Sequence, residues 1–148
     1  QPFLRADLPS ASRSSQTLGV MSNKAARIIS DAELAVLKAA LACSTTIEAR
    51  VLANARLDTL RVYRSCDCGC ASIGFLPAVQ ADGERPKVVV DCTGRSEDGE
   101  EVGVIVFGVP GRLVELECYW SRQEGAPLPR PETLIGWGSG QERSPPSR

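Results

Sequence analysis

The spacing of the hydrophobic residues changes once along this chain, near Asp58, and that change constrains the fold more than any other feature. Before it, apolar residues recur every three or four positions, as in an amphipathic helix. After it, apolar and polar residues alternate in short segments, as in half-buried strands. The order predicts an α+β domain, with two N-terminal helices packed on one face of an antiparallel sheet of about five strands.

The two helices are expected between residues 30 and 55. Ser30 and Glu33 form an S-x-x-E capping box, which predicts the start of the first helix. Leucine, valine and alanine then recur at helical spacing over residues 34–43. The hydroxyl residues at 44–46 end this helix and offer a new N-cap. Apolar residues over 47–55 predict a second, shorter helix.

The second half of the chain predicts strands joined by short turns. Beta-branched and aromatic residues dominate each apolar segment, and Gly, Pro, Asp and Thr separate the segments. The Pro110-Gly111 pair predicts a tight hairpin between the last two strands. Because the links are short, we expect an antiparallel meander. The strand segments are 60–63, 73–75, 87–92, 102–107 and 113–120.

Composition divides the chain into one domain and two terminal segments. Residues 1–20 lack periodicity, so we expect a disordered arm or an extension that does not belong to the fold. A single domain is expected over 21–136 and a disordered tail over 137–148. No stretch approaches the roughly 20 apolar residues of a membrane span, and 1–20 does not read as a signal peptide. We therefore expect a cytoplasmic protein that does not associate with membranes.

The ionisable residues exclude several kinds of function. The 17 basic residues nearly balance the 18 acidic ones, so no long-range field favours nucleic acid. The chain contains no histidine, which excludes a Ser-His-Asp triad, a His-ligated zinc ion and a His general base. No phosphate-binding glycine loop lies between a strand and a helix. These features favour a non-catalytic protein without a cofactor over an enzyme.

Three cysteines, Cys66, Cys68 and Cys70, lie within one short run and form the only local chemistry that stands out. Thiolates bind soft and borderline metals, and zinc commonly takes four ligands. We expect no cofactor; the alternative is a zinc ion held by these three cysteines, with Cys92 or Cys118 as the fourth ligand. Those two cysteines lie in strand patterns beside valine and leucine, so we expect both to be small buried core residues.

The spacing of the three cysteines argues against a stable zinc site. Structural zinc sites usually pair C-x-x-C knuckles, which this chain lacks. In a straight strand, side chains at every second position are about 6–7 Å apart, too far for the sulfurs to share one ion. Gly69 would have to fold the segment into a turn. A redox-sensitive segment is a second alternative, since neighbouring exposed thiols oxidise readily.

One face of the predicted sheet carries polar residues and is the predicted interaction surface. Alternation assigns Leu116 and Cys118 to the core side of the last strand. A face that combines carboxylates with tyrosines suits a basic protein partner, although ordinary solvated surface gives the same pattern. The favoured function is a protein-interaction module without catalytic activity. The residues predicted to bind the partner are Arg61, Tyr63, Asp91, Glu115, Glu117 and Tyr119.

The C-x-C-x-C run, together with a Leu116-Glu117-Cys118-Tyr119 strand ahead of a proline-rich end, resembles a family of small uncharacterised bacterial proteins. The resemblance covers about 32–134. Asp67 and Ala71 depart from the glycine and proline of the family pattern. Cys118 replaces a valine, which supports a packing role for it. The resemblance implies a compact α+β domain and no particular activity.

Overall fold

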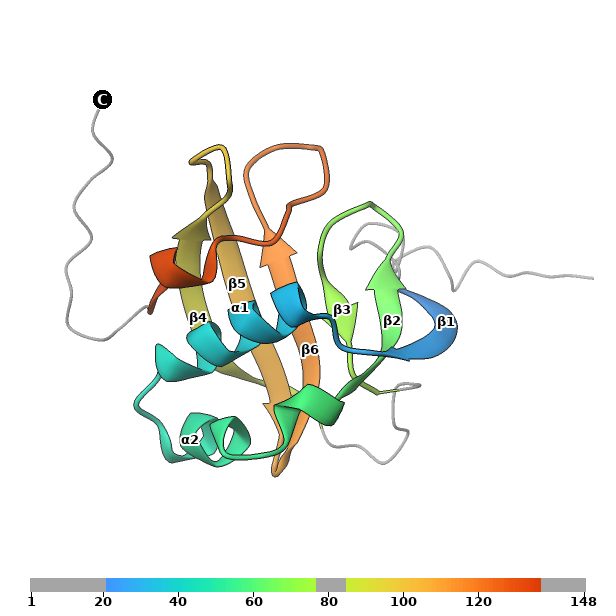
Figure 1. Ribbon diagram of the computed structural model, residues 1–148, viewed down its shortest axis with the longest axis vertical. Helices are drawn as coiled ribbons and strands as arrows, with labels where there is room; N and C mark the ends of the chain where they lie inside the picture. Colours follow the sequence, from blue (N-terminus) through green and yellow to red (C-terminus); the bar gives the residue numbers. More distant parts are fainter. Residues whose placement is uncertain (1–20, 77–84, 137–148) are drawn as a thin grey trace, which may run out of the picture.

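The computed structural model describes residues 21–76 and 85–136, and the predicted terminal segments 1–20 and 137–148 lie outside these described residues. The fold is α+β, with a seven-stranded sheet whose neighbouring strands are all antiparallel. Its strand order is β1-β2-β3-β6-β5-β4-β7 (Figure 1). The strands are β1 Met21–Ile28, β2 Arg61–Cys66, β3 Ile73–Gly74, β4 Lys87–Arg95, β5 Glu101–Val109, β6 Arg112–Tyr119 and β7 Ile135–Gly136.

The prediction of about five strands was too low, because the sheet extends at both edges. At one edge β1 pairs with β2, although its sequence Met-Ser-Asn-Lys-Ala-Ala-Arg-Ile lacks an alternating pattern. At the other edge the two-residue β7 pairs with Cys92 and Thr93 of β4. Both edge strands therefore depend on pairing with a longer neighbour, because neither has a strand pattern of its own.

The two helices begin where the capping residues predict. Helix α1 covers Asp31–Ala42, and α2 covers Ile47–Ala53. The Ser30 Oγ accepts the Glu33 amide hydrogen at 3.2 Å, and the Glu33 carboxylate accepts the Ser30 amide hydrogen at 2.9 Å. The Thr46 Oγ1 caps α2 by accepting from the Ala49 amide. The predicted capping box is confirmed.

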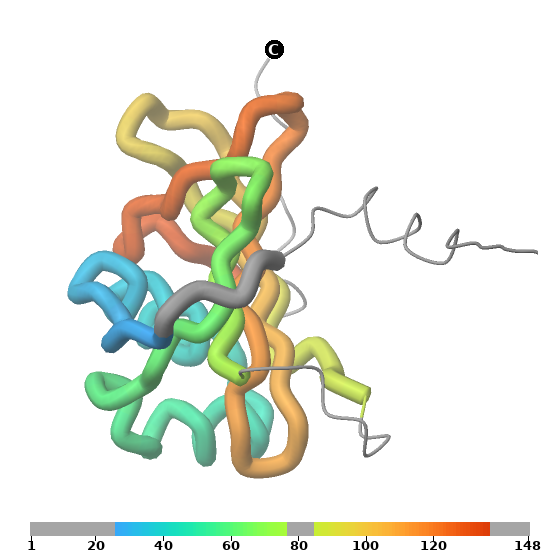
Figure 2. The backbone as a smooth tube through the Cα atoms, turned by 90° about the vertical axis from the view of Figure 1, so that its right-hand side faces the viewer, coloured from blue at the N-terminus to red at the C-terminus, as the bar shows by residue number. Residues whose placement is uncertain are grey.

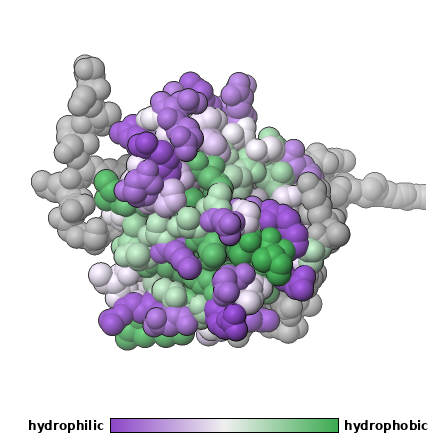
Figure 3. All heavy atoms as spheres, viewed as in Figure 1, coloured by the Kyte–Doolittle hydropathy of each residue, from purple (hydrophilic) through white to green (hydrophobic). Residues whose placement is uncertain are grey.

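The core lies between α1 and the face of the sheet that α1 crosses (Figures 1 and 2). Leu37 and Leu41 of α1 are fully buried, in the same cluster as Val104 and Val106 of β5 and Leu116 of β6. Figure 3 shows that apolar surface on the helix side is broken up by polar groups. Among the described residues, no helix is long and apolar enough to cross a membrane.

An ion pair links β1 to the start of α1. The Arg27 guanidinium donates to both carboxylate oxygens of Glu33, at 2.6 and 2.9 Å. Burial acts to raise the pKa of Glu33, but the hydrogen bonds from Arg27 and Ser30 outweigh it and hold the pKa below its ordinary value. The ionised carboxylate is therefore the form that stabilises this corner of the fold.

Replacing Glu33 by glutamine is expected to lower the free energy of unfolding by about 1–2 kcal/mol at neutral pH, because glutamine keeps the cap but loses the charge. The expected loss is kept this small because Arg27 is half-exposed, so solvent screens its charge. Because the pKa of Glu33 is lower in the folded than in the unfolded state, its carboxylate stabilises the fold fully at pH values above the unfolded-state pKa. This stabilisation is lost as the pH falls through the folded-state pKa. The difference between wild type and variant should therefore shrink below about pH 4. Urea denaturation across the acid range measures it, and a constant difference would contradict the assignment.

Candidate thiolate site

The site begins where β2 ends and the chain turns toward β3; residues 66–72 are called the thiol loop. Gly69 has φ 89°, in the left-handed region that favours glycine. The Cys70 amide lies 3.4 Å from the Cys68 sulfur and donates a hydrogen bond to it. The three Sγ atoms of the loop cysteines lie within 4.8 Å of one another. The spacing expected for a straight strand does not apply, because the chain turns at Gly69, as convergence of the sulfurs requires.

The three thiols have different contacts. The Cys66 and Cys68 sulfurs are 2.7 Å apart. The Cys70 thiol instead donates to the Ser72 hydroxyl at 3.2 Å. Cys68 is the exposed member, whereas Cys66 and Cys70 are half-buried. The loop therefore holds one sulfur pair in contact and a third sulfur turned toward Ser72.

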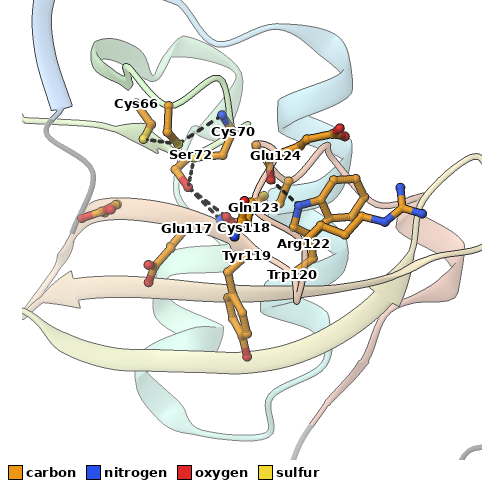
Figure 4. Close-up of a pocket in the computed structure, with 14 residues that line it drawn as sticks. Cys66, Cys70, Ser72, Glu117, Cys118, Tyr119, Trp120, Arg122, Gln123 and Glu124 are labelled. Atoms are coloured by element: carbon orange, nitrogen blue, oxygen red, sulfur yellow. Dashed lines mark hydrogen bonds between the residues drawn. The ribbon is translucent and has the colours of Figure 1, made fainter. Parts of the chain in front are cut away.

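Ser72 fastens the thiol loop to β6. Its side chain is buried, accepts from the Cys118 amide at 2.9 Å and donates to the Cys118 carbonyl at 3.3 Å (Figure 4). The loop and the strand lie 46 positions apart in the sequence. Because Ser72 also accepts from Cys70, the position of the third sulfur is set by the backbone of the sheet.

The segment that follows β6 packs against the thiol loop. The Ala71 amide donates to the Ala126 carbonyl at 2.8 Å. A Cβ atom on Gly125 would lie 2.4 Å from the backbone of Gly69 and Cys70, so only glycine allows this approach. The Trp120 indole donates to the Glu124 carbonyl, which closes the turn. The thiol loop is thereby held between β6 and residues 121–126.

An open depression of about 400 Å³ lies beside the thiols (Figure 4). The three loop cysteines line one part of it, and Trp120 with residues 122–126 lines another. Glu115, Glu117 and Tyr119 of β6 also line it. The depression therefore brings sulfur ligands and carboxylates to one solvent-accessible place.

Several ionisable groups of the depression have shifted pKa values. Burial and the contact with Cys68 raise the pKa of the Cys66 thiol to about 12. Hydrogen bonds from Cys66 and Cys70 lower the pKa of Cys68. Burial, followed by repulsion from Glu117, raises the pKa of Glu115, and burial alone raises the pKa of Glu117. Cys68, the most accessible sulfur, therefore ionises more readily than Cys66.

The strand register sorts the predicted partner-binding residues. Asp91 pairs with Ile105, which pairs with Glu117, so Asp91 and Glu117 share the sheet face away from α1. Glu115 lies on the same face, half-buried like Asp91 and Glu117, and Tyr119 is exposed beside them. This face, defined by Asp91, Glu115, Glu117 and Tyr119, is called the outer face.

Arg61 and Tyr63 lie on β2, which β3 separates from β6. Gly74 of β3 pairs with both Arg64 and Glu115, so Arg64 lies level with Glu115. Val62, between Arg61 and Tyr63, is buried in the core cluster, and the pairing of β1 with β2 shifts register beside Tyr63. Alternation from Arg64 therefore does not assign Arg61 and Tyr63 to a face, and their role in partner binding stays a prediction.

The strand cysteines are buried, as predicted. Cys92 and Cys118 are almost inaccessible, and burial raises the pKa of both thiols, that of Cys118 to about 12. Neither sulfur belongs to the group of three that converges in the loop, although Cys118 also lines the depression. The thiol of Cys43, at the C-cap of α1, lies near enough to that of Cys92 for each to influence the pKa of the other. This second thiol pair lies away from the depression.

Comparisons with known proteins add no relative: no family model, curated protein or solved structure matches the chain significantly. The resemblance to a family of small bacterial proteins therefore stays a prediction. The candidate site stands on its own geometry.

Proposed function

We propose that the protein binds zinc through the thiolates of Cys66, Cys68 and Cys70. The observation that carries the proposal is the convergence of the three sulfurs within 4.8 Å of one another. A zinc–thiolate bond is about 2.3 Å long, so ligating sulfurs around one tetrahedral ion are about 3.8 Å apart. Before any metal binds, the loop therefore holds its three sulfurs at spacings close to those that zinc requires.

The surroundings of the sulfurs support the same function. A backbone amide donates to the Cys68 sulfur, and the buried Ser72 hydroxyl orients the Cys70 thiol. Such outer contacts fix the position of metal ligands and tune their basicity. Because the thiols must lose their protons, zinc affinity should rise with pH. The proposal suits a reducing compartment such as the cytoplasm, where thiols persist.

The fourth coordination position would face the depression. The described residues bring no fourth cysteine to the loop, and the whole sequence has no histidine. A water molecule or a donor atom from a partner would complete the tetrahedron, as at zinc sites that keep an open position. Glu115 and Glu117 line the same depression and would feel the positive charge of the ion. A bound cation would lower the raised pKa of each carboxyl group.

A second candidate function is a protein-interaction module that uses the outer face. One observation favours it: Glu115 and Glu117 are two positions apart on β6 and line one depression, where burial, followed by repulsion from Glu117, raises the pKa of Glu115. A lysine or arginine of a partner would relieve that repulsion by pairing with the carboxylates. Glu117→Gln should then weaken capture of a basic peptide, whereas Cys68→Ser should abolish zinc binding and leave that capture unchanged, which separates the two candidates.

Titration of the reduced, metal-free protein with Co²⁺, followed by displacement with Zn²⁺, tests the zinc site. Cobalt thiolate coordination gives a near-ultraviolet charge-transfer band, which should saturate at about one equivalent and vanish on adding zinc. Cys68→Ser and Cys70→Ser should lose the band. Cys43→Ser should keep it, because that thiol lies beside Cys92 and not in the loop. No band, or a band that survives in both loop variants, would refute the proposal.

Gly69→Ala is expected to weaken zinc binding at least tenfold, because alanine resists the left-handed backbone that brings the sulfurs together. The matched control is Gly99→Ala: Gly99 has φ 84° in the hairpin between β4 and β5, and neither glycine has an atom within 4 Å of an added Cβ. Both variants should lose about 1–2 kcal/mol of stability. Competition with a chromophoric chelator measures affinity. Equal affinities for the two variants would show that the Gly69 turn does not organise the site.

A further inference from the structure

The thiol loop holds two of its sulfurs closer to each other than a shared metal ion requires. The Cys66 and Cys68 sulfurs are 2.7 Å apart, and both residues are free thiols. A disulfide bond is about 2.05 Å long, so the two sulfurs need to approach by only roughly 0.7 Å. Cys70 is separate from this pair, because its thiol is bonded to the Ser72 hydroxyl.

We propose that Cys66 and Cys68 form a reversible disulfide by exchange with a low-molecular-weight disulfide, and that this reaction disables the metal site. The exchange activity stands on the sulfur geometry alone. The effect on metal binding rests on the proposed function.

Exposure decides the order of the two steps. Cys68 is the exposed thiol of the pair, so an incoming disulfide reaches its sulfur first. The Cys68 thiolate attacks one sulfur of the small disulfide, the S–S bond of that molecule breaks, and its other half leaves as a thiolate. The product is a mixed disulfide between Cys68 and the small molecule.

Cys66 then completes the exchange. Its sulfur attacks the Cys68 sulfur, the mixed disulfide breaks, and the second small thiol leaves. The two protein thiols are oxidised by two electrons, the small disulfide is reduced to two thiols, and the two protons released by the cysteines end on those thiols. Cys70 does not compete, because Ser72 holds it toward the backbone of Cys118.

The two states of the loop exclude each other. Zinc needs deprotonated thiolates, and a Cys66–Cys68 disulfide removes two of the three. One remaining thiol, Cys70, cannot hold the ion alone. Conversely, a bound ion occupies the electron pairs with which Cys68 would attack. Metal should therefore protect the pair from oxidation, and oxidation should prevent metal binding.

The chain contains a second thiol pair that serves as an internal comparison. The thiols of Cys43 and Cys92 are near enough for each to influence the pKa of the other, but Cys92 is buried in β4 and Cys43 is half-buried. A small disulfide therefore cannot reach Cys92 in the folded protein. If proximity alone decided the reaction, both pairs would oxidise; if exposure is also required, only the loop pair will.

The experiment equilibrates the reduced, metal-free protein with oxidised and reduced glutathione, quenches the exchange with acid, then alkylates the free thiols of the denatured protein and counts them by intact mass. Of the six cysteines, we expect four to be alkylated, because the proposed disulfide takes two. Peptide mapping should place the link between Cys66 and Cys68. A link between Cys68 and Cys70, a link between Cys43 and Cys92 alone, or six free thiols would each overturn the proposal.

Three variants separate the steps. Cys70→Ser should still form the disulfide. Cys66→Ser should stop at the mixed disulfide and carry one glutathione on Cys68. Cys68→Ser should react at least tenfold more slowly, because its remaining loop thiols are half-buried. A Cys66→Ser protein that still loses two loop thiols would contradict the role given to Cys66.

Metal loading distinguishes a failure of this inference from a failure of the proposed function. The zinc-loaded protein should keep all its thiols under the same glutathione mixture, and the oxidised protein should give no cobalt charge-transfer band. A protein that forms the disulfide but never binds metal would refute zinc binding and leave the exchange standing. A protein that binds zinc without forming the disulfide, or that keeps zinc after oxidation, would refute the inference.

Discussion

Replacing Leu116 by alanine is expected to lower the free energy of unfolding by about 2–5 kcal/mol. Leu116 is fully buried in β6, where it pairs with Ile73 on one side and Val106 on the other. Removing its side-chain carbons opens a cavity between the sheet and α1, which close packing of the neighbours prevents from collapsing. Such a loss is a large part of the stability of a single domain.

The neighbouring residue provides the matched control. Glu117 is half-buried on the outer face, and burial raises the pKa of its carboxyl group, so the charged form is not stabilised by its surroundings. Glu117→Ala should change the free energy of unfolding by no more than about 0.5 kcal/mol. Urea denaturation with a common m value measures both variants. A larger loss for Glu117→Ala than for Leu116→Ala would mean that the outer face is the core.

The second large effect is the loss of zinc-dependent stability in Cys68→Ser. A ligand that binds only the folded state stabilises it by about 2.7 kcal/mol at one hundred times its dissociation constant. Wild type should show this gain in denaturation experiments with buffered zinc. Cys68→Ser should show none, while its metal-free stability should stay within about 0.5 kcal/mol of wild type, because Cys68 is exposed.

Gly99→Ala is the control for this measurement. It should lose stability through its left-handed backbone and still gain from zinc as much as wild type does, because Gly99 lies in the hairpin between β4 and β5 and not in the thiol loop. An equal zinc-dependent gain in wild type and Cys68→Ser would place any metal effect outside the thiol loop.

Sequence periodicity predicted those parts of the fold that are determined locally. Ser30 and Glu33 fixed the start of α1, because a capping box needs only residues close in the chain. The alternation in β6 correctly separated Leu116 and Cys118 from Glu115 and Glu117. The edge strands escaped prediction, because β1 and β7 depend on hydrogen bonds to partner strands and carry no pattern of their own.

The candidate site was only partly predictable. The sequence identified the three loop cysteines, but their convergence depends on one backbone angle at Gly69, and spacing alone indicated sulfurs too far apart. Ser72 and Gly125 were missed, because their roles arise from contacts with β6 and with the thiol loop across long stretches of chain. Local sequence patterns carry no signal for such long-range contacts, so only the folded structure reveals the roles of Ser72 and Gly125.

X-ray absorption at the zinc edge, measured on the zinc-loaded protein, tests the central claim most directly. The account predicts three sulfur neighbours at about 2.3 Å and one oxygen or nitrogen neighbour at about 2.0–2.2 Å. It also predicts fewer than three sulfur neighbours in Cys66→Ser. A shell made only of oxygen and nitrogen atoms, or three sulfurs that persist in Cys66→Ser, would contradict zinc binding by Cys66, Cys68 and Cys70.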